Sequence, residues 1–222
     1  QNDPNNPYQR DNIIERKGRV DIRCEHKAIV HGFYSDDVDD LCTLIVLGFR
    51  FDPNSVARRI KEAHVVVKFA AMDKNTPDPE VLDMYPNGQF SFAPSTHQET
   101  LVRGGGVSVG GIAAGVPVGG ELKLEHTIER DISDAAGVRG SIDLRGRNWG
   151  AKNSVSWTLW ENKSAKTGVL PSMPAAILLK RRDMRQFKAT FTIKIAADSK
   201  TTLGSAFKTD PKDDDVWYDP ER

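Results

Sequence analysis

The chain has 222 residues, of which 38% are hydrophobic and 28% are charged, as is usual for a globular protein. Lys and Arg together number 31, and so do Asp and Glu, so the formal net charge is zero. This balance argues against a nucleic-acid-binding protein, which usually carries a basic excess that neutralises phosphates. No apolar run approaches the roughly 20 residues that a membrane-spanning helix needs.

The dominant pattern along the chain is the alternation of apolar and polar residues, which places one face of an extended strand in a core. Residues 1–17 are polar and predict a flexible lead-in that crosses an edge of the fold. Residues 20–30 predict the first strand, with His26 on its apolar side as a core or edge histidine. Residues 41–51 are apolar at both parities, which predicts a central strand covered on both faces.

Residues 57–71 predict a further strand, and short strands flank the turn Pro86-Asn87-Gly88. The stretch 103–120 is uncharged after Arg103 and consists of small and β-branched residues. No Gly-Lys-Ser/Thr follows it, which argues against a phosphate-binding loop. Two interpretations remain, a packed or mobile glycine-rich loop and a membrane-inserting hairpin, because uncharged alternation over about ten residues matches one transmembrane β-strand.

Two features of the following residues argue against the membrane interpretation. The strand after Gly120 becomes heavily charged, and Pro117 cannot donate a hydrogen bond to a strand partner. Residues 122–128 and 138–144 alternate and predict a long hairpin with its turn near 134–137.

The last third of the chain has the clearest strand patterns, at residues 155–160, 175–179 and 187–195. In all we expect nine or ten strands, no long helix and an all-β fold. An antiparallel two-sheet β-sandwich buries one face of each strand, and a β-barrel is the alternative. We expect a single domain over residues 18–208, followed by an acidic tail at 209–222.

Metal-binding motifs are few in this sequence. Calcium is the one metal that the sequence suggests, through the acidic loop residues Asp36, Asp37, Asp39 and Asp40. The loop lacks the glycine and spacing of an EF-hand, so we interpret it as a solvated loop that blunts a sheet edge, and we expect no cofactor. Two separated cysteines and five scattered histidines do not form a zinc motif. Cys24 and Cys42 are expected to be small core residues, with a bridge between neighbouring strands as the alternative.

Tryptophans give the one candidate binding surface. Trp157 shares the parity of apolar neighbours and predicts a core position, whereas Trp160 lies on the other face. Exposed aromatic residues at loops bind sugars, lipid headgroups or protein partners. Trp149, Trp160 and Asn162, which opens the loop to Pro174, are therefore the candidate binding residues.

Several segments resemble uncharacterised proteins of filamentous fungi. They are residues 41–51 with the following Ala57-Arg58-Arg59-Ile60-Lys61-Glu62-Ala63, Ser156-Trp157-Thr158-Leu159-Trp160-Glu161-Asn162, Gly168-Val169-Leu170-Pro171 and Ala176-Ile177-Leu178-Leu179-Lys180-Arg181. The resemblance covers most of the chain after about residue 20. It implies a cytoplasmic protein, with secretion as the alternative, and it carries no activity or catalytic residues.

The sequence thus leaves three functional hypotheses. The first is a non-enzymatic β-sandwich that binds a protein or small-ligand partner through its loops. The second is a membrane-active, pore-forming-like protein whose 103–120 segment inserts as a hairpin. The third is a hydrolase that uses loop carboxylates and His97, although no nucleophile motif supports it.

Overall fold

The computed structural model describes residues 2–222 except 36–37, 56–57, 74, 114–115 and 198–213, and it describes the backbone alone at 38–39, 93 and 96–133. The described residues form eleven strands and no helix, which confirms the all-β class. The strands are β1 (Asn12–Arg16), β2 (Val20–Ser35), β3 (Val38–Pro53), β4 (Ile60–Ala71), β5 (Glu80–Tyr85), β6 (Gly88–Ala113), β7 (Val116–Asp143), β8 (Ser154–Trp160), β9 (Ser172–Lys180), β10 (Phe187–Ala197) and β11 (Val216–Tyr218).

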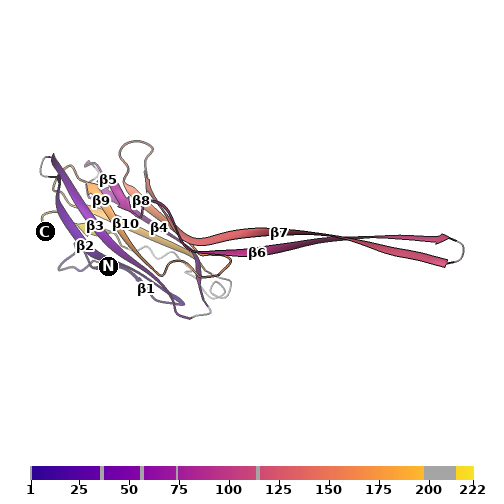
Figure 1. The fold of residues 1–222 in the computed structure, drawn as a ribbon. Helices are drawn as coiled ribbons and strands as arrows, with labels where there is room; N and C mark the ends of the chain where they lie inside the picture. The colour runs from indigo at the N-terminus through magenta and orange to yellow at the C-terminus, as the bar shows by residue number, and fades with distance from the viewer. Residues whose placement is uncertain (1, 36–37, 56–57, 74, 114–115, 198–213) are drawn as a thin grey trace.

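The strands form two antiparallel sheets that face each other (Figure 1). One sheet has five strands in the order β1-β2-β3-β9-β5, and the other has six in the order β11-β10-β4-β8-β7-β6. Each order is open, with a first and a last strand, so the predicted sandwich is confirmed and the alternative of a barrel is not. The strand β6 forms one edge of the six-stranded sheet, and it extends with β7 far beyond the body (Figure 1).

The core lies between the inner faces of the two sheets. Along β10 the side chains of Phe187, Ala189, Phe191 and Ile193 are buried in alternation with polar neighbours, as the sequence predicts. Trp157 of β8 is fully buried and its ring centroid lies 5.7 Å from that of Phe49 in the opposite sheet. The predicted core position of Trp157 is therefore confirmed.

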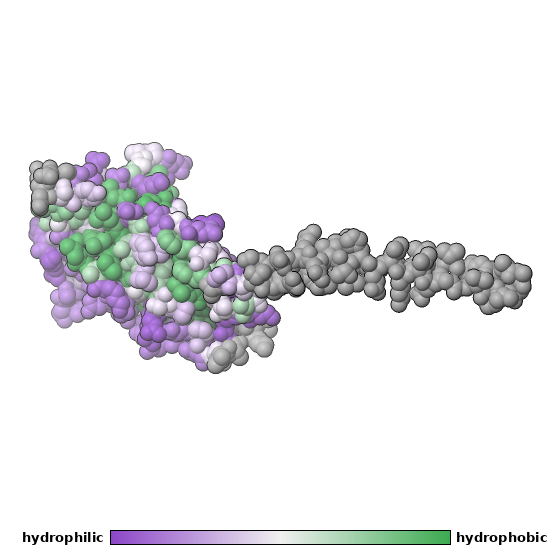
Figure 2. Space-filling model, viewed as in Figure 1, coloured by the Kyte–Doolittle hydropathy of each residue, from purple (hydrophilic) through white to green (hydrophobic). Residues whose placement is uncertain are grey.

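The strand β3 is central in its sheet, between β2 and β9, but it is not covered on both faces as predicted. Its inward residues Ile45 and Leu47 are fully buried, whereas the outward Leu44 is 38% exposed. Leu44 pairs with Val30 of β2, which is 56% exposed. The outer face of this sheet therefore carries apolar residues at the surface, as the green area on the visible face of the body shows (Figure 2).

Both ends of the chain contribute strands. Within the segment expected as a flexible lead-in, β1 forms an edge strand of the five-stranded sheet, because Ile13 and Ile14 supply buried side chains. Within the acidic tail, Val216 and Tyr218 of β11 are fully buried against β10. Cys24 and Cys42 are both buried, which confirms the expected core positions, and no disulfide joins these two residues.

Candidate functional site: a projecting two-stranded ribbon

The most unusual feature of the fold is the long pair of strands β6 and β7. The strand β8 pairs with β7 only from Gly137, opposite Trp160, to Asp143, opposite Ser154. Beyond Gly137, β6 and β7 pair only with each other among the described residues, as far as Ala113 opposite Val116. We call the part from Ser95 and Asp134 to this end the ribbon; it runs away from the body in Figure 1. At about 3.4 Å per residue it is roughly 60 Å long.

A bulge marks the root of the ribbon. Phe92 pairs with Ala136 and Ser95 pairs with Asp134, so β6 contains one residue more than β7 in this interval. An extra residue exchanges the faces on which the following residues of that strand fall. From Ser95 outward, odd-numbered residues of β6 therefore share a face with even-numbered residues of β7. This is the side of β7 on which Val138 is buried in the core.

This register makes the outer ribbon amphipathic. One face, which we call the apolar face, carries the pairs Leu101–Ile128, Gly105–Leu124, Val107–Leu122, Val109–Gly120, Gly111–Val118 and Ala113–Val116. Only Arg103 with His126 interrupts this set. The opposite face carries Glu121, Lys123 and Glu125 of β7. Apolar and polar residues alternate along each strand, and the pairing places most apolar residues of the two strands on the same face.

The predicted hairpin turn near 134–137 is wrong. These residues lie inside β7, and the last pair between β6 and β7 is Ala113 with Val116, more than 15 residues earlier in the chain. The prediction failed because Asp134-Ala135-Ala136-Gly137 has a turn-like composition, although these residues continue β7 into the body. Glu121, Lys123 and Glu125, the first charged residues after Gly120, then fall on the face opposite the apolar one and do not interrupt it.

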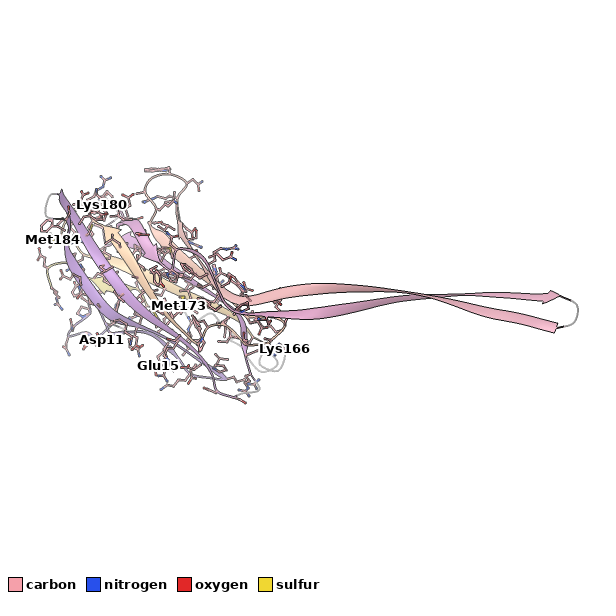
Figure 3. All side chains as sticks on the ribbon, viewed as in Figure 1. Asp11, Glu15, Lys166, Met173, Lys180 and Met184 are labelled. Carbon is pink, nitrogen blue, oxygen red and sulfur yellow. The ribbon has the colours of Figure 1, made fainter. Side chains whose placement is uncertain are left out.

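The loop from 161 to 171 fixes the root of the ribbon. Asn162 is fully buried, and its Nδ2 donates hydrogen bonds to Ser95 Oγ at 2.8 Å and to the carbonyl oxygen of Asp134 at 3.0 Å. Its Oδ1 accepts a hydrogen bond from Ala165 N at 2.9 Å. Ser164 adds a hydrogen bond from its hydroxyl to Asp134 Oδ2 at 2.9 Å. Both strands are thereby held to one loop of the body where the ribbon begins, close to Lys166 in Figure 3.

Trp160 lies beside the same root. Its Nε1 donates a hydrogen bond to the carbonyl oxygen of Ala135 at 3.1 Å, and Arg139 lies over its ring, 6.0 Å from the centroid. The ring is half-buried on the outer side of the six-stranded sheet. Trp160 and Asn162, two of the candidate binding residues, therefore both contact the ribbon root through the residues around Asp134.

Trp149, the third candidate, lies elsewhere. Its side chain is 79% exposed in the loop between β7 and β8, and it borders a hollow of about 810 Å³. Basic groups of this hollow include Arg147, which pairs with Asp78 at 3.0 Å, and Lys180, which pairs with Asp40 at 2.6 Å. The hydrogen bond to Asp40 raises the pKa of Lys180. Lys180 lies at the end of the body away from the ribbon (Figure 3).

The calcium candidates are only partly described. Asp36 and Asp37 lie outside the described residues, and so does the side chain of Asp39. Asp40 forms the ion pair with Lys180. Among the side chains that the structure does describe, no group of three or more His, Cys, Asp or Glu residues could hold a metal ion. Calcium binding by this loop stays a prediction.

No family model matches the chain, and no curated protein matches it. One similar solved structure is the membrane-inserted form of the NetB toxin from Clostridium perfringens, with 9% sequence identity and a TM-score of 0.33 over 80% of this chain and 78% of that chain. Similarity at this level establishes neither a shared fold nor a shared activity. Among the described residues, no helix is both long and apolar enough to cross a bilayer.

Proposed function

We propose that the protein is membrane-active and that the outer part of the ribbon inserts into a lipid bilayer. The observation that supports this proposal is the register of β6 and β7, which places the apolar residues Val107, Val109, Leu122 and Leu124 on one face and the charged residues Glu121, Lys123 and Glu125 on the other. A strand that crosses a membrane in a closed sheet has this pattern, with apolar residues toward lipid and polar residues toward the interior.

The length of the uninterrupted apolar face agrees with the thickness of a bilayer. The apolar face is uninterrupted from Gly105, opposite Leu124, to Ala113, opposite Val116. A transmembrane β-strand needs about 9–11 residues when it is tilted, which is close to the length of this stretch. Pro117 pairs with Ile112 near the outer end. Its missing N–H then falls where the hairpin would leave the hydrocarbon, so it costs little there.

Insertion requires more than one copy of the chain. A bilayer offers no hydrogen bonds to the backbone, so the two free edges of a single ribbon would each carry a costly row of unpaired groups. Several ribbons that pair edge to edge in a closed sheet satisfy all of these groups. The polar faces would then enclose a water-filled passage, and leakage of small solutes is the expected activity.

Dye release from liposomes tests the proposal. Val107→Arg and Val109→Arg each place a charge on the apolar face, at a cost of roughly 2–4 kcal/mol in the middle of a bilayer. Dye release is expected to fall by about tenfold or more. Ser108→Arg is the matched control, because it places the same charge on the opposite face and should leave release within about twofold of the native protein. Native protein that leaves liposomes of every lipid composition intact contradicts the proposal.

A second candidate function, ligand binding through loops, is supported by the hollow beside Trp149. Its volume of about 810 Å³ is in the range of small-molecule sites, roughly 300–1,000 Å³. An exposed indole beside charged groups suits a sugar ring, which stacks on the aromatic face. Thermal melting with a panel of soluble oligosaccharides tests this function. A ligand that raises the melting temperature of the native protein but not of Trp149→Ala supports it, and no shift with any sugar contradicts it.

A further inference from the structure

Three aromatic side chains lie exposed where the sandwich ends at its open edge. Phe90 and Phe92 of β6 are 38% and 37% exposed, and Tyr85, the last residue of β5, is 56% exposed. The ring centroids of Tyr85 and Phe90 are 6.2 Å apart. We call these three residues the aromatic edge.

The aromatic edge continues the inner face of the six-stranded sheet. Phe90 pairs with Val138, which is fully buried, and Phe92 pairs with Ala136, which is 7% exposed. Directly paired residues lie on the same face of a sheet. The two phenylalanines stay exposed because β6 and β5 are the last strands of their sheets, so no further strand covers them.

The backbone around the aromatic edge is held firmly. Tyr85 is followed by Pro86, whose carbonyl oxygen accepts a hydrogen bond from Trp157 Nε1 at 3.0 Å in the buried core. A side chain at Gly140 would collide with the Pro86 carbonyl, so the crossing from β5 to β6 lies directly against β7. Aromatic groups that are fixed before binding lose little conformational entropy on docking, and such groups often contribute most of the affinity of an interface.

The same edge of β6 has free backbone groups along its whole length. Among the described residues, β6 pairs only with β7, and no other strand pairs with the outer edge of β7 from Val116 to Ala136, where Asn162 and Trp160 bond only the carbonyl oxygens of Asp134 and Ala135. When several copies stand side by side in a ring and their ribbons point in the same direction, the strands alternate β6 and β7 around the ring. Each β6 then lies beside the β7 of the next copy, which is antiparallel to it and of matching length. An interface that joins two different edges of identical chains can close into a ring.

We propose that the aromatic edge is covered by a second copy of this chain, whose β7 root and adjoining 161–168 loop dock against Phe90 and Phe92. The neighbouring β7 carries its Asp134–Ala136 segment next to the root of β6, and Asn162 ties the 161–168 loop to that segment. This inference rests on the proposed function, since edge-to-edge pairing of the ribbons brings the two surfaces together. It adds a docking site within the folded body, outside the membrane.

The test compares assembly on vesicles for native protein, Phe92→Ser and Tyr85→Ser. Each protein is incubated with vesicles of phosphatidylcholine and phosphatidylserine, extracted in mild detergent and sized by chemical crosslinking and sedimentation. The ring-sized fraction is expected to fall by about tenfold or more in each variant, while vesicle binding stays within about twofold. Tyr85→Ser is included because Tyr85 is largely exposed, so its replacement should leave the fold intact. The melting temperatures of both soluble variants show whether each one still folds.

Phe33→Ser and Tyr34→Ser are the matched controls, because these residues of β2 are 64% and 61% exposed and are not part of the aromatic edge. They should assemble like the native protein. If Phe92→Ser and Tyr85→Ser assemble as well as the native protein, or if the controls fail equally, the aromatic edge is not the docking site although membrane insertion stands. If native protein forms neither rings nor leaks in any vesicle, both the proposed function and this inference are overturned.

Discussion

The ring of Trp160 lies directly on Gly137, at the position where β8 stops pairing with β7. A Cβ at Gly137 would meet the Cε2 atom of Trp160 at 2.8 Å and the carbonyl oxygen of Phe90 at 2.7 Å. These two residues form the last pair between β7 and β8 before the ribbon begins. The body of the protein therefore ends at a position where only glycine fits.

Gly137→Ala is expected to destabilise the fold by roughly 1–3 kcal/mol, because the added methyl group overpacks the contact with Trp160. Chemical denaturation measures this change. Gly32→Ala is the control, because no atom lies within 4 Å of the position of its Cβ. It should change the free energy of unfolding by less than about 0.5 kcal/mol. Equal stability of the two variants would mean that Trp160 does not pack on Gly137.

Asn162→Asp is expected to cost roughly 1–3 kcal/mol or more of folding free energy. The carboxylate keeps an acceptor for Ala165 N but loses the donor to Ser95 and Asp134, and it brings an oxygen against the carbonyl of Asp134. Denaturant titration checks the prediction, with the exposed Asn148→Asp as the control for added charge. A stability loss no larger than that of Asn148→Asp would show that Asn162 does not hold the ribbon root.

Stability is expected to fall as the pH is lowered from about 8 to about 5, and His26 is one cause. Its Nδ1 lies 2.7 Å from the carbonyl oxygen of Arg10, so this nitrogen donates, and Nε2 accepts from the Tyr218 hydroxyl at 2.8 Å. Burial lowers the pKa of His26, and burial followed by the charge of Arg181 lowers the pKa of His31.

The sign follows from proton uptake. A folded-state pKa below the unfolded value of about 6.5 means that the unfolded chain binds more protons as the pH falls through that value, so unfolding becomes easier. The melting temperature should decline over this range in native protein and decline less in His26→Phe. A native melting temperature that stays constant or rises toward low pH would contradict this role of the partly buried His26.

The strand patterns were predictable from sequence wherever one face of a strand meets the core. The alternation at 187–195 predicted the buried residues of β10, because parity alone decides which side chains point inward. Parity within one strand cannot give the register between two strands. The bulge between Phe92 and Ser95, which sets the apolar residues of β6 in phase with those of β7, was therefore not predicted.

The candidate site was predictable only in part. The sequence singled out the 103–120 segment for membrane insertion and Trp160 and Asn162 for binding, but it did not indicate that Trp160 and Asn162 lie at the root of the ribbon whose outer part contains that segment. Asn162 contacts Ser95 and Asp134, which are 67 and 28 residues away along the chain. Hydrogen bonds between residues so far apart have no local pattern. The outer face of β3 shows a second limit of sequence patterns. Its apolar residues were predictable, but the pattern does not tell whether another layer covers that face, and Leu44 is in fact exposed.

The most direct test of membrane insertion labels single cysteines along the ribbon with an environment-sensitive fluorophore. Gly106→Cys, Val107→Cys, Ser108→Cys and Val109→Cys cover two positions on each face, and the native Cys24 and Cys42 are buried and should stay unlabelled under native conditions. On vesicles that contain nitroxide-labelled lipid, the account predicts blue-shifted and quenched emission at 107 and 109 and neither change at 106 and 108. Equal emission at all four positions, with or without vesicles, would contradict it.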